Sequence, residues 1–215
     1  MLILNMLFSF IFSSFLLALS PGPDNLYLTA LTSKSGKFSG ISFLIGLLIG
    51  CLIHTILLAF GLNTLIIQNE MIFEFIKYIG VAYLIFLSYG VYKSENSYDK
   101  FEDYKPTENF FRNLKKGIFM NLFNPKVFLF FALFFPNFLF SEILSFKVQI
   151  LILGLLFILI TFIVFGLIII FSDFVHRNFS KNKNFKIFAK YFNISVLMLI
   201  ALLIFFSENN ITLIY

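Results

Sequence analysis

Six apolar runs, separated by short polar segments, occupy most of the chain. A transmembrane helix needs about 20 consecutive apolar residues, and each run approaches or exceeds that length. We therefore predict an all-α membrane protein in which residues 1–215 form one transmembrane domain. The six predicted helices lie at about 2–31, 39–62, 71–92, 117–138, 148–171 and 187–206.

Composition supports a membrane location, because 60% of the residues are hydrophobic and mean hydropathy is +0.94. A soluble domain is about 45 to 50% apolar. We interpret the 34 Phe residues, with no Trp, as the coding bias of an AT-rich genome and not as a binding surface. The single cysteine, Cys51, excludes an intramolecular disulfide and thiolate-rich metal chemistry.

The basic residues are concentrated in alternate loops, which indicates the side of the membrane on which each loop lies. Thirteen of the 16 lie in the first, third and fifth predicted loops or within one helical turn of them: Lys34, Lys37, Lys93, Lys100, Lys105, Arg112, Lys115, Lys116, Arg177, Lys181, Lys183, Lys186 and Lys190. Only Lys147 lies in an even-numbered loop, because Lys77 and Lys126 fall within helices. The positive-inside rule then places the odd loops, including 93–116, in the cytoplasm and both termini in the periplasm or outside. The net charge of +5 is thus explained by topology, and we expect no nucleic-acid partner.

Two of the predicted helices are interrupted. Pro21, Gly22 and Pro23 interrupt the first helix, and Pro125 interrupts the fourth, which is its counterpart in the second half of the chain. Each half would contain three helices, and because three is an odd number the two halves must have opposite orientations in the membrane. Paired interrupted helices are typical of transporter binding sites. We therefore predict a 3+3 inverted repeat whose breaks serve as hinges and supply free backbone groups to a cavity.

Two opposite charges lie beside these breaks. Asp24 is ten residues before Lys34, and Lys126 is ten residues after Lys116, so each lies roughly 15 Å from the cytoplasmic face, near the bilayer midplane. They could form a fixed ion pair between the helices. Alternatively, Asp24 binds the ammonium of an amino-acid-like solute, or a coupling proton, and Lys126 binds the carboxylate. The breaks on both sides favour this second interpretation.

Neutral polar groups accompany the two charges. Asn25, Asn121 and Asn124 are candidates to orient the solute or to bond between helices. Gly46, Gly50 and Gly80 are candidates for close helix packing.

His54 and Glu74 are candidates for a proton relay near the outer face. The alternative is that His54 is a satisfied polar residue and that Glu74 pairs with Lys77 on its own helix.

Enzyme functions find no support, since the chain has no HExxH, GxSxG or Walker motif. We expect no cofactor and no resident metal. A cation or heavy-metal permease of related architecture is an alternative, in which Asp24 and Asn124 would be oxygen ligands, although Lys126 at the same depth argues against it. A non-transporting scaffold is a third class, but it would not need the paired breaks.

The chain resembles the LysE/RhtB family of amino-acid exporters through two stretches, Ser20-Pro21-Gly22-Pro23-Asp24 and Asn124-Pro125-Lys126 running on to Phe135-Pro136-Asn137-Phe138. Further resemblance lies in Leu58-Ala59-Phe60-Gly61-Leu62 and in the segment 77–84, so that it covers about residues 10 to 140. The resemblance implies a secondary transporter that exports small amino acids or their derivatives across a bacterial inner membrane, coupled to the proton motive force. It leaves the amino acid carried and a homo-oligomeric state open.

Overall fold

The computed structural model describes residues 2–62, 70–93, 109–179 and 183–206, and every secondary-structure element within them is helical. In chain order the elements are α1 (Leu2–Leu19), α2 (Pro23–Leu57), η1 (Leu58–Leu62), α4 (Glu70–Lys93), α5 (Phe110–Leu122), α6 (Pro125–Leu129), η3 (Phe130–Phe134), η4 (Phe135–Phe138), α7 (Phe146–Phe179) and α8 (Lys183–Phe205). The η1 and η3 segments are π-helical and η4 is a 3-10 helix. The all-α prediction is confirmed for this part of the chain.

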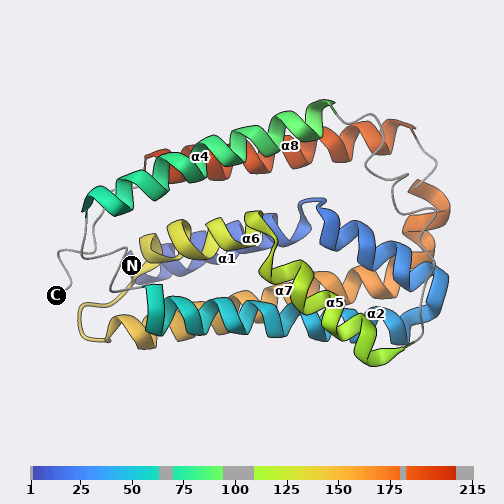
Figure 1. Ribbon diagram of the computed structural model, residues 1–215, viewed down its shortest axis with the longest axis horizontal. Helices are drawn as coiled ribbons and strands as arrows, with labels where there is room; N and C mark the ends of the chain where they lie inside the picture. Colours follow the sequence, from blue (N-terminus) through green and yellow to red (C-terminus); the bar gives the residue numbers. More distant parts are fainter. Residues whose placement is uncertain (1, 63–69, 94–108, 180–182, 207–215) are drawn as a thin grey trace.

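The helices run beside one another along the long axis of the molecule, and α1 begins at the end of the bundle where α8 finishes (Figure 1). The first part of α2 continues the path of α1, and the chain then reverses at Gly36, whose φ of 81° suits glycine. The second part of α2 packs against α5 and α7, α1 packs against α7, and α4 packs against α8.

Several helices are long and apolar enough to cross a membrane. Within the described residues three pass this test alone: Pro23–Phe60, Phe146–Ser172 and Ile187–Phe205. A fourth span arises if Phe110–Leu122 and Pro125–Phe138, which are bent by 50° relative to each other, count as one. Leu4–Leu19 is a shorter apolar helix. The chain is therefore a multi-pass membrane protein.

The segment predicted as the loop 93–116 is helical in its last part, which corrects that prediction. Helix α5 begins at Phe110, and the side chain of Asn109 caps it by accepting a hydrogen bond from the Arg112 amide at 2.9 Å. Lys115 and Lys116 lie in the same helix and lower its hydropathy, so the helix extends beyond the apolar run. Helices α7 and α8 also extend beyond their predicted apolar runs into polar sequence.

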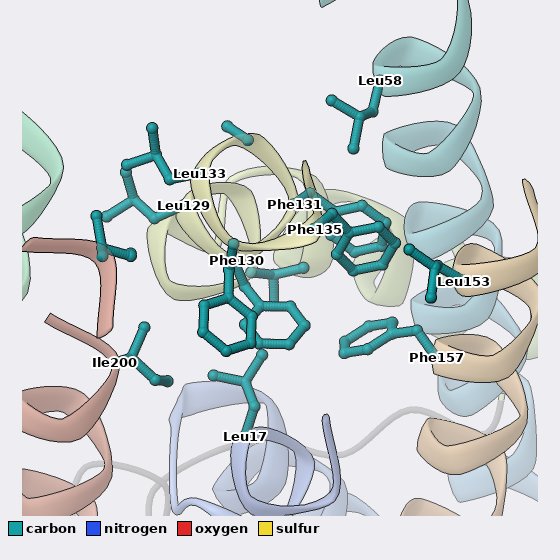
Figure 2. Packing of buried hydrophobic residues seen from close by; sticks show 14 of the residues in the cluster. Leu17, Leu58, Leu129, Phe130, Phe131, Leu133, Phe135, Leu153, Phe157 and Ile200 are labelled. Carbon is teal, nitrogen blue, oxygen red and sulfur yellow. The ribbon is translucent and has the colours of Figure 1, made fainter. Parts of the chain in front are cut away.

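The abundant Phe residues fill the interior between α1, the α6–η4 segment and α7. Phe131 stacks on Phe135 with ring centroids 4.2 Å apart, and Phe157 of α7 contacts Phe130 and Phe131 at 5.4 and 5.1 Å (Figure 2). Leucines and isoleucines of the neighbouring helices surround these rings. The rings thus support the α6–η4 segment that follows the second break.

Two glycines let α2 and α5 meet backbone to backbone. A Cβ atom on Gly46 would lie 3.0 Å from the Gly117 Cα and would collide with the Leu114 carbonyl. A Cβ atom on Gly117 would likewise lie 3.0 Å from the Gly46 Cα. Lipid gives no hydrophobic drive for helices to associate, so such close approach is a main source of attraction between them. This contact fixes α5 against α2 just before α5 reaches the break.

Candidate functional site

Two interrupted helices meet in the middle of the bundle. Helix α1 ends at Leu19, and α2 begins at Pro23 with Gly22 as its N-cap residue. Helix α5 ends at Leu122, and α6 begins at Pro125 with Asn124 as its N-cap residue. In both cases proline occupies the first helical position, where its missing N–H has no partner to lose. The predicted breaks in the first and fourth helices are present in the structure.

Lys126 caps the end of α1 and not of its own helix. The side chain is buried, and its Nζ donates hydrogen bonds to the carbonyls of Leu17 at 3.3 Å and Ser20 at 3.1 Å. The last carbonyls of a helix have no partner within the helix and carry its partial negative charge. The break in α1 therefore creates the ligands that stabilise a buried ammonium.

Asp24 lies in the first turn of α2, at the positive end of that helix. It is buried, its Oδ1 accepts a hydrogen bond from the Asn25 amide at 3.1 Å, and its Oδ2 accepts one from Asn124 Nδ2 at 3.4 Å. The N-cap residue of this helix is Gly22, so Asp24 lies inside the helix and does not cap it. The Asn124 Oδ1 accepts a hydrogen bond from the Lys126 amide at 3.1 Å, so one side chain caps α6 and also contacts Asp24.

The two charges are neighbours without being an ion pair. A Cβ atom on Gly22 would lie 2.6 Å from Asp24 Oδ1 and 3.2 Å from Lys126 Nζ. These charged atoms are therefore at most 5.8 Å apart, the sum of 2.6 and 3.2 Å. Among the described residues no ion pair joins Asp24 to Lys126, and each charge is held by the end of a helix.

Two of the predicted polar residues, Asn25 and Asn121, have buried amide oxygens without hydrogen-bond partners among the described residues. Asn25 donates to the Ala18 carbonyl at 2.9 Å, but its Oδ1 has no partner among the described residues. Asn121 donates to Cys51 Sγ at 3.4 Å, and its Oδ1 is likewise buried without a partner in the described part of the chain. A buried acceptor with no donor is costly, and such groups often mark places where water or a ligand binds.

His54 and Glu74, the residues predicted to form a proton relay, have other partners in the structure. His54 Nε2 lies 3.5 Å from the Asn121 carbonyl, and the His54 ring stacks on Phe131 with centroids 5.2 Å apart. Glu74 is half exposed and pairs with Lys77 at 3.8 Å on its own helix. No hydrogen bond between described residues links His54 to Glu74, so the proton relay stays a prediction.

Gly50 and Gly80 both lie at tight contacts. A Cβ atom on Gly50 would lie 2.6 Å from Asn121 Oδ1, and one on Gly80 would lie 2.5 Å from a methyl group of Leu133. Gly50 thus makes room for the Asn121 side chain between α2 and α5, and Gly80 lets α4 approach η3.

The sequence reasoning missed a third contributor, Asn193 of α8. The Ser20 hydroxyl, inside the first break, donates a hydrogen bond to Asn193 Oδ1 at 2.7 Å. The available signal was a single amide inside the last apolar run, and nothing local indicated which helix it would meet.

A multi-pass helical protein whose interrupted helices bring a buried carboxylate and a buried ammonium together has the architecture of a secondary transporter. The chain belongs to the LysE type translocator family, whose model matches residues 15–207. The resemblance seen in the motifs is therefore confirmed, and the match extends over α7 and α8, where motifs were lacking.

Named relatives agree with this family. A homoserine/homoserine lactone efflux protein of Salmonella typhimurium is 33% identical over 135 residues, which are 63% of this chain and 65% of the relative. The protein of the same name from Salmonella typhi gives the same figures, and an uncharacterized membrane protein of Pseudomonas aeruginosa is 29% identical over 126 residues, 56% of this chain and 57% of the relative. The match thus spans less than two thirds of each relative's length. No solved structure matches the chain significantly.

Proposed function

We propose that the protein exports small amino acids or amino-acid derivatives across the bacterial inner membrane, coupled to the proton gradient. Membership of the translocator family and the names of the two Salmonella relatives support an amino-acid-type solute. The sequence has no site for nucleotide hydrolysis, which favours an ion gradient as the source of energy.

The observation that carries the proposal is the separation of two buried opposite charges at facing helix breaks. Lys126 and Asp24 lie close together, yet each binds backbone or amide groups and neither binds the other. A zwitterionic amino acid offers one carboxylate for Lys126 and one ammonium for Asp24. The solute can replace weaker partners without first breaking an ion pair.

Alternating access follows from an inverted repeat of three helices per half. In this repeat α1 corresponds to α5, the second part of α2 corresponds to α7, and α4 corresponds to α8. When corresponding helices are exchanged, the α1–α7 contact becomes the contact between α5 and the second part of α2, and the α4–α8 contact is unchanged. This exchange pattern supports six spans in two inverted halves. Rocking of one half against the other would then move the two breaks, with Pro21, Gly22, Pro23 and Pro125 acting as hinges.

Efflux of radiolabelled amino acids from loaded cells tests the proposal. The intact protein is compared with Asp24→Asn and Lys126→Met, and we expect each substitution to reduce efflux at unchanged protein abundance in the membrane. An additional control is Ser195→Ala, a substitution on an exposed position of α8. Unchanged efflux in both site variants would remove the assigned site. Metal-dependent growth without amino-acid efflux would instead favour a cation permease.

A further inference from the structure

The exposed face of α5 is charged where the helix begins and apolar where it ends. This face consists of Phe111, Arg112, Lys115, Phe119 and Phe123, all of which are exposed. Residues three and four positions apart are neighbours on a helix, so the five side chains form one stripe. The cations lie in the first half of the stripe. At its end Phe119 and Phe123 stack on each other with ring centroids 6.1 Å apart.

The two cations of this face lack the kind of partner that the next residue has. Lys116 lies over the ring of Tyr27 at 4.1 Å. Within the described ranges, neither a carboxylate nor an aromatic ring pairs with the side chain of Arg112 or Lys115. Arg112 also lies in the first turn of α5, where the helix dipole disfavours a cation, so the stability of α5 does not account for it. Both cations can therefore bind an anion from outside the chain.

A phospholipid matches the order of groups along this face. Its phosphate supplies the negative charge for Arg112 and Lys115, and a guanidinium binds phosphate through two parallel hydrogen bonds. Its acyl chains run from the headgroup towards the bilayer midplane, and Phe119 and Phe123 follow the cations towards the break. A helix rises about 12 Å over these eight residues from Lys115 to Phe123, which is most of a hydrocarbon leaflet about 15 Å thick.

The opposite face of α5 connects this surface to the candidate site. Gly117 lies against the backbone of α2 at Gly46. Helix α5 then ends at Leu122, and the next helix is capped by Asn124, whose Nδ2 donates to Asp24 Oδ2 at 3.4 Å. A ligand that holds the exposed face of α5 therefore acts on the helix that leads directly into the second break.

We propose that the exposed face of α5 binds an anionic phospholipid, with its phosphate on Arg112 and Lys115 and an acyl chain along Phe119 and Phe123. Anionic lipids of the cytoplasmic leaflet attract basic residues, and the positive-inside rule places the start of α5 on that side. The binding itself is independent of the proposed function, whereas its effect on transport rests on that function. A lipid that holds α5 in place preserves the arrangement at the second break, so transport is faster with the lipid bound.

Native mass spectrometry of the full-length protein in detergent tests the binding directly. The probe is dioleoyl phosphatidylglycerol, and dioleoyl phosphatidylcholine is the neutral reference. We expect the intact protein to prefer the anionic lipid. Arg112→Gln combined with Lys115→Gln should lower the affinity about 25-fold, from about fivefold for each cation.

The matched control removes the same charge at the same end of the bundle, by Lys93→Gln on α4 combined with Lys190→Gln on α8. It should leave the affinity nearly unchanged. Equal losses in the two double variants would show a general surface attraction and would overturn the site.

A second pair of measurements tests the acyl contact and the source of the phosphate. Phe119→Ala combined with Phe123→Ala should weaken binding of dioleoyl phosphatidylglycerol and leave binding of the short-chain dihexanoyl lipid unchanged. An unchanged affinity for the long-chain lipid would contradict the acyl contact. Displacement of the lipid by excess glycerol phosphate would assign the cations to a free phosphate and would also overturn the inference.

Counterflow of radiolabelled amino acids in phosphatidylcholine liposomes, with and without phosphatidylglycerol, separates this inference from the proposed function. We expect the anionic lipid to raise the rate for the intact protein but not for the Arg112→Gln, Lys115→Gln variant. Equal stimulation of both proteins would refute the effect on transport. Lipid binding at α5 without counterflow of any amino acid would overturn the proposed function and leave the lipid site standing.

Discussion

At the residue scale, each charge at the breaks is balanced by the end of a helix. A lone charged side chain at mid-membrane costs about 3 kcal/mol on insertion scales. The carbonyl groups at the end of α1 reduce this cost for Lys126, and the amide groups at the start of α2 reduce it for Asp24. Each group thus has partners of its own at a helix end, and the contact between the two groups is left for a solute.

Gly22 separates the two charges, so Gly22→Ala should disturb transport more than folding. The new methyl group would meet only the ends of the Asp24 and Lys126 side chains, which can move aside, and the φ of −139° is accessible to alanine. We expect efflux to fall about tenfold or more through misplacement of the charges. Amino-acid efflux and protein abundance in the membrane are measured together.

The matched control for this substitution is Gly90→Ala in α4, where an added Cβ would meet no atom within 4 Å. Equal efflux from Gly22→Ala and Gly90→Ala would argue against a functional arrangement of the two charges around Gly22.

At the element scale, the helices are held by close backbone contacts and by breaks that local residues dictate. We predict that Gly46→Ala destabilises the fold by about 1 to 3 kcal/mol, because the new methyl group meets the α5 backbone, which cannot move as a side chain can. The measurement is the loss of helical circular dichroism on heating in detergent. Gly166→Ala in α7, where a Cβ meets nothing within 4 Å, is the control, and matching melting curves would contradict the prediction.

The sequence allowed the breaks to be predicted, because proline and glycine act on the backbone through their own covalent structure. It also placed Asp24 and Lys126 near one another, since their depth follows from counting residues along a helix. It could not predict that Lys126 binds carbonyl groups of α1, because any residue type provides a carbonyl. The Ser20–Asn193 bond joins residues 173 positions apart, and only the packed bundle brings them together.

At the scale of the whole molecule, the fold brings basic residues that flank the odd-numbered loops to one end of the bundle. Lys34 and Lys37 flank the turn at Gly36, and Lys93 ends α4 at the same end of the bundle, on the right of Figure 1. The residues between η4 and α7 lie at the opposite end, on the left. The positive-inside rule then predicts that the first end faces the cytoplasm.

Site-specific labelling tests this orientation in a Cys51→Ala background, which removes the only native thiol. Ile143→Cys, at a position 95% exposed between η4 and α7, should react with a membrane-impermeant maleimide added to intact spheroplasts. Phe111→Cys, at a position 71% exposed near the start of α5, should react only after the membrane is permeabilised. Because the two positions lie at opposite ends of the bundle, the reverse pattern would invert the topology, and labelling of both in intact spheroplasts would contradict a membrane-spanning arrangement of the segment that joins them.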